Sequence, residues 1–378
     1  MILKSIYLQQ FRNYLKHDFT FEDGVNVIYG YNGQGKTNLL EAISYTCITK
    51  SFRTNTDAEA IPFHTNFFKI TSHFIFDPSI KKDVTVEYIQ GEGKRIYIDG
   101  VRVQSASEVV GLFPIIILTP ENEAITYGSP SERRRFLDFI LSQTDKFYLT
   151  RIQDFRRVVR QRNKILFDAQ NNRYGFREKI EPWNLELYEL NKVITNKRIQ
   201  FIRDFQEIFR PIFKQLTLDQ EDISISYVPS FKQEFQEKEV FLHELEKILN
   251  LEILRGNTFI GPHRDEISFL NNEWDLRKYG SRGQHRTAVI ALKIAEYFYV
   301  YQIKKEKPIF LLDDVYTEID KIREKNLTEF FEDLGQIFLT TSDVDLKIDS
   351  GLEKHKKISY YFVDTTQPIP HTELGQTE

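Results

Sequence analysis

The sequence predicts an α/β fold in which a phosphate-binding sheet is interrupted by a second, mostly helical lobe. One observation is a glycine-rich stretch, residues 25–43, that reads as a strand, a loop and a helix in that order. Another is the pattern at residues 309–314, a short buried strand that ends in two acids. These two stretches have the form of two halves of one phosphate site, yet they stand near opposite ends of a chain of 378 residues. A whole lobe is therefore expected between them.

The glycine loop, residues 30–37, fits the pattern G-x-x-x-x-G-K-[ST]. Glycines let the backbone wrap with its N–H groups pointing inward, where they and the start of the following helix can hold a triphosphate. Lys36 is expected to reach the β- and γ-phosphates, and Thr37 to give its hydroxyl to Mg²⁺. The predicted cofactors are thus ATP and Mg²⁺. The side chains and backbone groups expected to contact the nucleotide belong to Gly30, Asn32, Gly33, Gln34, Gly35, Lys36, Thr37 and Asn38.

Length and composition limit the possible classes of protein. A chain of 378 residues exceeds the usual single-core limit of about 250–300 residues, so two lobes are expected, and an apolar fraction of 41% is ample for a core. The single cysteine, Cys47, excludes a disulfide framework and a cysteine-based metal site. No apolar stretch approaches about 18 residues, and no basic start precedes an apolar run, so we expect a soluble cytoplasmic protein with no membrane partner.

The N-terminal part reads as strand-rich with one helix, the helix that follows the glycine loop. Residues 2–8, 67–76 and 84–89 alternate apolar and polar side chains as half-buried strands do, and residues 91–100 have the pattern of a hairpin. The continuous apolar run at residues 113–118 is expected to be a buried strand. This part therefore predicts the first half of a nucleotide-binding sheet with an antiparallel extension.

Helical patterns dominate after residue 128. Ser129 and Pro130 offer an N-cap and a proline at the first helical position, and the helix is expected to run to about Leu141. A second helix is expected at residues 147–170, and a third, long helix from Pro182 to about residue 212. The remaining expected elements are a strand at 223–227, a helix at 240–254, a connection rich in glycine, proline and charge at 255–265, and a hairpin at 266–276.

The net charge of −4 gives no sign of a nucleic-acid binder, but the charge is unevenly distributed. Between residues 151 and 164 a run of arginines and a lysine is opposed only by Asp154. Arginines that contact phosphates give salt-sensitive affinity without base readout. The alternative is a helical bundle whose arginines only solvate its outside, and the arginines at 133–135 could equally pair with nearby acids. The candidate DNA-binding residues are Arg151, Arg156, Arg157 and Arg160.

The second half of the phosphate site is expected at residues 309–314, which fit the Walker B pattern. The strand would deliver Asp313 to Mg²⁺ and Asp314 to the attacking water. Upstream, Ser281, Gly283 and Gln284 stand at the start of another helix, which forms a second anion-binding nest. Two phosphate-binding helix starts are hard to use on one nucleotide unless they come from two copies of the chain.

The order of these motifs resembles the ABC-type ATPase head, in which the signature of one subunit closes over the nucleotide held by the other. The resemblance implies that Ser281 takes part in catalysis across a homodimer and that Asp320 belongs to the loop that crosses its interface. Ser342 stands where many such ATPases carry a switch histidine, and Glu121 and Asn122 lie where a glutamine is usual. The predicted parts are residues 1–118 and 257–378 for the two portions of the ATPase lobe, and 119–256 for the inserted helical lobe.

Seven motifs together resemble the RecF family of bacterial recombination mediators, which is related to SMC proteins, and the resemblance spans nearly the whole chain. It implies a protein that binds DNA in an ATP-dependent way, dimerises on ATP and hydrolyses it slowly. It further implies a preference for duplex next to single-stranded gaps, work with RecR and RecO to help load RecA, and a contact of Arg12 with the nucleotide. The motifs are residues 11–14, 30–43, 51–54, 128–130 with 133–138, 261–265, 281–287 and 311–320.

Three other functions compete with this interpretation. The nucleotide-binding subunit of a membrane transporter shares the head, but it predicts a shorter chain and a switch histidine. A structural DNA tether with a degenerate ATPase conflicts with the intact motif residues, which are Lys36, Thr37, Ser281, Gly283, Asp313 and Asp314. A nuclease would need a further cluster of acids or histidines, which the sequence does not offer. The inserted lobe is too short for the long heptad arms of SMC-type relatives, so we expect a compact clamp.

Overall fold

A computed structural model describes residues 1–231, 237–314, 327–342 and 357–364. The chain forms two compact units, of which unit 1 comprises residues 1–120 and 300–378 and unit 2 comprises residues 121–299. The sequence prediction divided the chain at residues 118 and 256, so it assigned to the ATPase lobe the residues 257–299 that here belong to unit 2. Within the described ranges, no helix combines the length and the apolar character needed to cross a membrane.

A parallel sheet in unit 1 carries both halves of the predicted phosphate site. Its strands run in the order β14–β3–β13–β12–β8, and each neighbouring pair is parallel. The residues of β8 and β12 are all buried, as expected for strands covered on both faces. Because parallel strands end at one edge of a sheet, the glycine loop after β3 and Asp313 after β12 lie at the same edge. The strands are β3 (Val25–Tyr29), β8 (Ile115–Leu118), β12 (Ile309–Leu312), β13 (Ile337–Thr341) and β14 (Ile358–Phe362).

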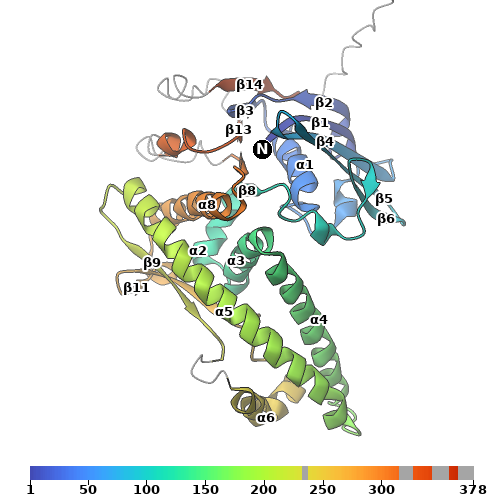
Figure 1. Ribbon diagram of the computed structural model, residues 1–378, viewed down its shortest axis with the longest axis vertical. Coiled ribbons are helices and arrows are strands. Elements are labelled where there is room, and N and C mark those ends of the chain that lie inside the picture. The colour runs from blue at the N-terminus through green and yellow to red at the C-terminus, as the bar shows by residue number, and fades with distance from the viewer. Residues whose placement is uncertain (232–236, 315–326, 343–356, 365–378) are drawn as a thin grey trace, which may run out of the picture. The chain divides into compact units, whose positions relative to one another are not determined.

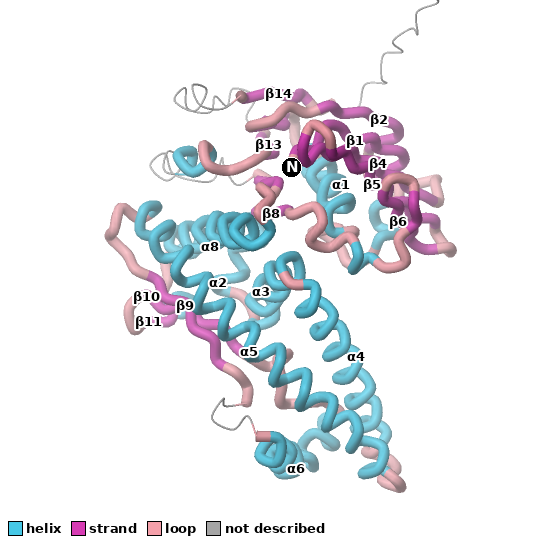
Figure 2. The backbone as a smooth tube through the Cα atoms, in the orientation of Figure 1, coloured by secondary structure: helices cyan, strands magenta, loops and turns pink. Residues whose placement is uncertain are grey.

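An antiparallel sheet in unit 1 lies against the helix that follows the glycine loop. This helix, α1 (Lys36–Ile48), contacts strands of both sheets and is buried nearly all round, which explains why its sequence lacks a polar face. Figure 2 shows α1 beside the magenta strands of this unit. The sheet has the order β2–β1–β4–β5–β6–β7. Its strands and the short 3₁₀ helices of unit 1 are β1 (Ile2–Phe11), β2 (Tyr14–Thr20), η1 (Asp57–Ala60), β4 (Phe67–Asp77), β5 (Ile80–Ile89), β6 (Gly93–Ile98), β7 (Val101–Arg102) and η2 (Ala106–Glu108), with η3 (Pro120–Glu123) at the division between the units.

The helices α4 (Lys146–Asp168) and α5 (Phe176–Leu216) form a long hairpin in unit 2, and α6 (Lys238–Arg255) packs across its end (Figure 1). Each of the three helices presents apolar side chains at helical spacing. Their contact buries a cluster at the turn of the hairpin, so the three elements hold one another in place. The cluster consists of Leu166, Ala169, Phe176, Ile180, Leu249 and Ile253.

The start of α5 corrects the sequence prediction, which placed it at Pro182. The helix begins at Phe176, after Gly175 with a φ of 62°, and Pro182 lies inside it. Phe176 and Ile180 are both buried in the cluster at the turn of the hairpin. Burial of two such side chains is worth about 1.5–3 kcal/mol each, which offsets the roughly 3 kcal/mol that a proline costs inside a helix. The prediction was wrong because tertiary packing outweighs the local preference of proline.

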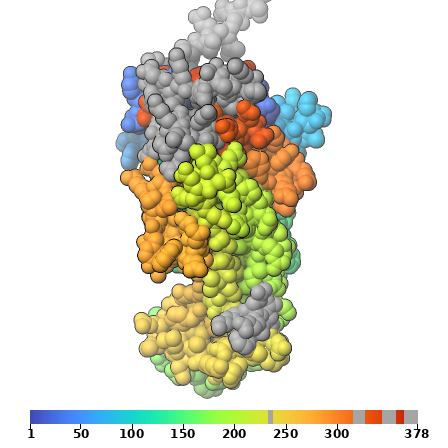
Figure 3. All heavy atoms as spheres, turned by 90° about the vertical axis from the view of Figure 1, so that its left-hand side faces the viewer, coloured from blue at the N-terminus to red at the C-terminus, as the bar shows by residue number. Residues whose placement is uncertain are grey.

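A small antiparallel sheet packs against the C-terminal part of α5. Its order is β11–β10–β9, and the Ile225 N–H on β9 donates to the Gln206 side-chain carbonyl on α5 at 2.7 Å. In Figure 3 the yellow-green atoms of α5 and the orange atoms of the β10–β11 region lie side by side on one face of unit 2. The remaining elements are α2 (Ala124–Tyr127), α3 (Pro130–Thr144), β9 (Ile223–Val228), β10 (Glu266–Asn271), β11 (Trp274–Asp275), α7 (Leu276–Tyr279) and α8 (Arg282–Lys304), which contains the division between the units.

Most of the predicted elements are confirmed within a few residues, including the strand, loop and helix around the glycine motif and the buried strand before Asp313. The sequence analysis did not predict β2, α2, α7, β14 or the short 3₁₀ helices η1, η2 and η3. The five residues of β14 alternate only weakly between exposed and half-buried positions. Their place at the sheet edge is decided by pairing with β3, which the local sequence does not encode.

Candidate nucleotide-binding site

The glycine loop lies between β3 and α1, and its backbone needs glycine. Gly33 and Gly35 have φ angles of 82° and 109°, a region that L side chains rarely adopt. Gly35 is also the N-cap of α1, and it has no side chain that could accept a hydrogen bond from the first turn. The N–H groups at the start of α1 are therefore directed to the loop, as in other anion-binding helix starts.

Two of the glycines also leave no room for a side chain. A Cβ atom on Gly30 would lie 2.5 Å from the Val363 carbonyl oxygen, and one on Gly35 would lie 2.9 Å from side-chain atoms of Asn13 and Tyr14. A Cβ atom on Gly33 would meet nothing within 4 Å. Close packing and backbone conformation therefore both require glycine at 30 and 35, whereas backbone conformation alone requires it at 33.

The carbonyl groups of the loop are held by the turn between β1 and β2. The Tyr14 hydroxyl donates to the Gly35 carbonyl at 3.0 Å, and the Asn13 amide donates to the Gly33 carbonyl at 3.4 Å. A peptide group whose carbonyl is bound on one side presents the neighbouring N–H groups to the other. The sequence prediction did not assign a role to Asn13 or Tyr14, although their motif was noticed.

Lys36 is buried, and its ammonium group lies across the loop that precedes it. Its Nζ donates to the carbonyl oxygens of Gly30 and Tyr31 at 2.9 and 3.2 Å. In the loop between Tyr31 and Lys36, Asn32 is exposed and Gln34 is half-buried. The positive charge and the glycine backbone thus surround one cradle, which fits the phosphates of a nucleotide.

The two halves of the predicted site meet in Thr37 and Asp313. The Thr37 hydroxyl donates to Asp313 Oδ1 at 2.9 Å, and the hydroxyl of Thr340 donates to the same oxygen at 2.8 Å. The Asp313 backbone N–H donates to the Leu118 carbonyl at 2.9 Å. Hydroxyl and carboxylate oxygens are the ligands that Mg²⁺ prefers, so these residues fit that ion. Thr340 was missed because only the neighbouring strand β13 brings it to Asp313.

Asp314 follows Asp313 with an unusual backbone. Its φ is 50°, in the left-handed region, and its N–H donates to the Thr340 hydroxyl at 2.9 Å. Aspartate tolerates this conformation better than most residues, and strained residues of this kind cluster at active sites. The structure therefore holds Asp313 and Asp314 together through one threonine.

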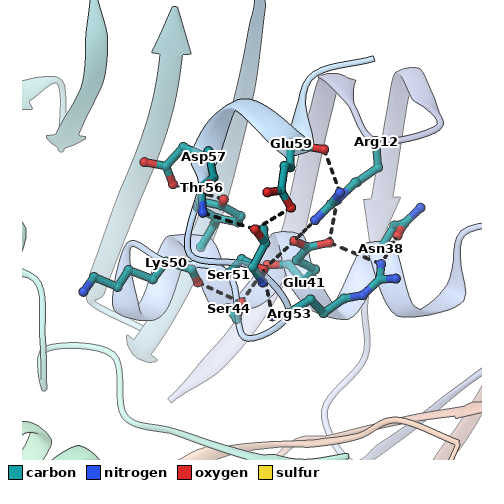
Figure 4. Close-up of polar contacts among 12 residues, drawn as sticks. Arg12, Asn38, Glu41, Ser44, Lys50, Ser51, Arg53, Thr56, Asp57 and Glu59 are labelled. Atoms are coloured by element: carbon teal, nitrogen blue, oxygen red, sulfur yellow. Dashed lines mark hydrogen bonds and ion pairs between the residues drawn. The ribbon is translucent and has the colours of Figure 1, made fainter. Parts of the chain in front are cut away.

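Arg12 makes its contacts with a buried carboxylate of α1 (Figure 4). Its Nε and Nη2 donate to the two carboxylate oxygens of Glu41 at 2.8 and 2.6 Å, and its Nη1 donates to the Glu59 carbonyl at 2.7 Å. Burial alone lowers the pKa of the Arg12 guanidinium, but the hydrogen bond and charge of Glu41 outweigh it, so the pKa is raised. The predicted contact of Arg12 with the nucleotide stays a prediction.

Two further side chains from the loop after α1 converge on Glu41. The Ser51 hydroxyl donates to Glu41 Oε1 at 2.6 Å, and Arg53 Nη1 lies 3.6 Å from Glu41 Oε2. Arg53 also donates to the Asn38 side-chain carbonyl at 2.8 Å. Asn38, predicted to contact the nucleotide, is thus part of this network. Sequence patterns could not identify Glu41, because it stands on a helix of apolar neighbours.

The signature residues start helix α8 in unit 2. Ser281 and Gln284 form a reciprocal cap, in which the Gln284 N–H donates to the Ser281 hydroxyl at 3.2 Å and the Ser281 N–H to the Gln284 side-chain carbonyl at 2.8 Å. The Gln284 amide donates to Glu221 at 2.9 Å. Ser281 is exposed and Gly283 half-buried, so the helix start is ordered by its own side chains. Asp320 lies outside the described residues.

The four arginines predicted to bind DNA differ in their partners. Arg151 lies 3.1 Å from Asp154, Arg156 lies 3.2 Å from Asp138, and Arg157 lies 2.7 Å from Glu186. In the part of the chain that the structure describes, exposed Arg160 makes no ion pair or hydrogen bond. Lys164, one turn further along α4, is also exposed and likewise unpaired there.

The arginines at 133–135 contact acids and carbonyls. The buried Arg133 donates to both carboxylate oxygens of Glu266, at 2.8 and 3.0 Å, and Arg134 donates to the Asp265 carbonyl at 2.8 Å. Arg135 lies 3.8 Å from Glu132. The contacts of these three arginines therefore agree with the alternative that they pair with nearby acids.

Side chains of several elements of unit 2 contact the connection at residues 255–265. The buried Arg198 donates to the Pro262 carbonyl and to Asp138, both at 2.7 Å. The His263 ring lies against Phe155 and donates through Nε2 to the Thr258 carbonyl at 2.9 Å. Burial lowers the pKa of His263 to about 4. The glycine, proline and charged residues of this connection thus coincide with a densely hydrogen-bonded part of unit 2.

Among the residues that the structure describes, no group of three or more histidine, cysteine, aspartate or glutamate side chains could hold a metal ion. A divalent ion in unit 1 would therefore depend on Thr37 and Asp313 together with phosphate oxygens of a ligand. This is how Mg²⁺ is usually bound in nucleotide sites, through one or two protein groups and the phosphates.

The chain matches the model of the RecF/RecN/SMC N terminal domain family over residues 2–358. It is 40% identical over 351 residues to the DNA replication and repair protein RecF of Chloroherpeton thalassium, which covers 91% of this chain and 95% of that protein. The RecF protein of Bacillus thuringiensis is 36% identical over 351 residues, covering 91% of this chain and 93% of that protein.

Solved structures agree with this relationship. The recombination mediator protein RecF with ATP superposes with a TM-score of 0.86 at 30% identity, covering 97% of this chain and 96% of that chain. An Smc head domain from Pyrococcus furiosus has a TM-score of 0.53 at 14% identity, over 95% of this chain and 92% of that chain, and shares the fold alone. The predicted ABC-type ATPase head is thus confirmed. The chain belongs to the RecF family of DNA replication and repair proteins.

Proposed function

We propose that this protein binds ATP with Mg²⁺ at the glycine loop and hydrolyses it slowly, in a reaction that DNA stimulates. The single observation that carries the proposal is the contact between Thr37 and Asp313 at the mouth of the loop. Thr37 and Asp313 would hold the ion, and Lys36 would neutralise the phosphates from the loop side. Asp314 would orient the attacking water. Bound Mg²⁺ would supply charge stabilisation for the leaving phosphates.

Dimerisation on ATP is the second part of the proposal. Ser281, Gly283 and Gln284 stand at a helix start that Ser281 and Gln284 cap, and the same chain has another helix start at Gly35, where no side chain caps the first turn. A helix start favours an anion through its N–H groups and its dipole. We infer that Ser281 and its neighbours bind the γ-phosphate of ATP held by a second copy, and that Asp320 crosses the interface between the copies.

The ligand of the dimer is proposed to be double-stranded DNA next to single-stranded gaps, in the cytoplasm. Family membership supports this, since the relatives are DNA replication and repair proteins. Proteins of the RecR and RecO families are the proposed partners in loading recombinase, because the solved relative is a mediator of the RecFOR pathway. Arg160, with Lys164 one turn further along α4, is the favoured candidate for contact with the DNA backbone. Neither side chain has an ion-pair or hydrogen-bond partner among the described residues.

The experiment that tests the proposal is the molar mass in solution without nucleotide, with ADP and with ATP, each with and without gapped duplex DNA. A monomer that becomes a dimer only with ATP, and more completely on DNA, is the expected result. A monomer under every condition would leave the signature helix with a structural role only.

A matched pair of variants isolates the signature residue. Aspartate and asparagine are both good N-cap residues, so Ser281→Asp and Ser281→Asn should each preserve the start of α8. Only Ser281→Asp places a negative charge against the triphosphate of the second copy. We expect Ser281→Asn to dimerise with ATP and Ser281→Asp to remain monomeric while binding ATP normally. Equal dimerisation of both variants would contradict the role of Ser281.

A further inference from the structure

Glu41 is a fully buried carboxylate on α1, one turn after Thr37, and it is the centre of the network in Figure 4. It accepts two hydrogen bonds from Arg12 and one from the Ser51 hydroxyl. Removing a carboxylate from water costs several kcal/mol unless it is paired and hydrogen-bonded, and here the pairing is complete. A buried apolar side chain would fit this mostly apolar helix at lower cost, so the charge has a purpose other than packing.

One arm of the network leads from Glu41 through Arg53 to the glycine loop. Ser51, bound to Glu41, accepts hydrogen bonds from the N–H groups of Arg53 and Thr54 at 2.9 and 3.0 Å and so shapes their turn. Arg53 donates to Asn38, and the Asn38 amide donates to the Asn13 side-chain carbonyl at 2.8 Å. Asn13 in turn donates to the Gly33 carbonyl.

The other arm leads through Arg12. Its N–H donates to the Ala60 carbonyl at 2.8 Å, its φ is 55°, and its guanidinium is fixed by Glu41 and by the Glu59 carbonyl. Arg12 directly precedes Asn13 and Tyr14 in the turn, and these residues hold the carbonyls of Gly33 and Gly35. Both arms therefore end on carbonyl groups of the glycine loop.

We propose that Glu41 is a positioning residue for the nucleotide site. Through its two arginines it holds Asn38 and the turn of Asn13 and Tyr14 in place. Asn13 and Tyr14 in turn keep the loop carbonyls turned away, so that the loop N–H groups converge on the phosphates. The chemistry served is binding of the nucleotide phosphates, and the inference rests on the proposed function to that extent. The Glu41 carboxylate is bound by Arg12 and Ser51, so it acts on the loop through these side chains and their neighbours.

The test is equilibrium binding of a fluorescent ADP analogue to Glu41→Gln, which keeps the shape of the side chain but removes its charge. ADP is used because no hydrolysis follows. We expect binding about tenfold weaker than in the wild type, within the usual range for coupling between sites. The matched control is Glu252→Gln, because Glu252 is also fully buried, accepts a hydrogen bond from the buried Arg162 at 2.6 Å and belongs to unit 2.

A purely structural role for Glu41 predicts a different pattern. Both variants would then lower the melting temperature while binding the analogue as the wild type does, and this result would overturn the inference alone. A wild type that does not bind the analogue would overturn the proposed nucleotide site and the inference with it. Weaker binding in Glu252→Gln equal to that in Glu41→Gln would also count against a specific role.

A second set of variants serves if Glu41→Gln does not fold. Arg53 is half exposed, so Arg53→Gln is tolerated more easily, and Asn13→Ala removes the end of the same arm. If Arg53 acts through Asn38 and Asn13, the two losses of affinity will not add in the double variant. Additive losses, or no loss in Arg53→Gln, would overturn the positioning arm.

Discussion

The Thr37 hydroxyl lies 2.9 Å from Asp313 Oδ1, and 276 positions of the chain separate the two residues. They meet because β3 and β12 are strands of one parallel sheet, whose C-terminal ends lie at one edge. The residues inserted between them, 121–299, form a compact unit of their own. The phosphate site is therefore complete only when both ends of the chain have folded into one sheet.

Removing the Thr37 hydroxyl should weaken Mg²⁺ binding and, with it, ATP hydrolysis. Thr37→Val keeps the shape of the side chain but removes the hydroxyl, and loss of a metal ligand should reduce Mg²⁺ affinity and hydrolysis by about 100-fold or more, above the roughly 10–100-fold cost of losing an outer partner. Phosphate release over a Mg²⁺ titration measures this. Thr37→Ser, which keeps the hydroxyl, is the control and should retain most of the activity. Normal hydrolysis in Thr37→Val would refute the Mg²⁺ assignment.

The glycines of the loop should not be equivalent. Gly33→Ala meets only backbone strain, worth about 1–3 kcal/mol, because its Cβ atom would lie in open space. Gly35→Ala adds a 2.9 Å approach to Asn13 and Tyr14, so these anchors must move and the cradle should open. We expect Gly35→Ala to lose ATP binding and Gly33→Ala to keep a weakened affinity, measured by titration calorimetry. The opposite ranking would show that close packing does not shape the loop.

Neutralising Arg160 and Lys164 should reduce the salt dependence of DNA affinity. Each lost phosphate contact lowers the slope of log K against log salt by about 0.9, so Arg160→Gln with Lys164→Gln should lower it by about 2. Arg177→Gln removes the same charge from a guanidinium already bound twice to Glu246 and serves as the control. Fluorescence anisotropy of labelled duplex at several salt concentrations measures the slopes. Identical slopes in wild type and double variant would place the DNA face elsewhere.

Stability should depend on pH through His263. Its pKa is about 4 in the folded chain and 6.5 as a free side chain, so the unfolded chain binds its proton first as the pH falls. The contribution is fully present above pH 6.5 and is lost as the pH falls through 4, and it amounts to about 3 kcal/mol. His263→Gln should flatten the pH dependence of the urea midpoint in this interval, whereas His243→Gln, at an exposed position, should not. A curve unchanged in His263→Gln would show that other groups control acid stability.

Local patterns were sufficient for much of the site. Spacing and residue type predicted the strand, the glycine loop and the helix that holds Lys36 and Thr37, and they predicted the buried strand before Asp313. These motifs can be recognised in the sequence because phosphate binding needs particular backbone angles and particular oxygen ligands at fixed positions. The start of α5 was mispredicted because it depends on a buried cluster contributed by α4 and α6.

The sequence by itself determined the fold class, the identity of the loop and the two acids, since each is encoded by neighbours in the chain. Only the tertiary structure decided that Glu41 binds Arg12 and Arg53 and that Thr340 and Thr37 share Asp313. It also decided that Arg157 is paired, whereas Arg160 has no partner among the residues that the structure describes. These relationships depend on contacts between residues far apart in the chain. Such contacts form only when sheets and helices have packed, so no local pattern of residues records them.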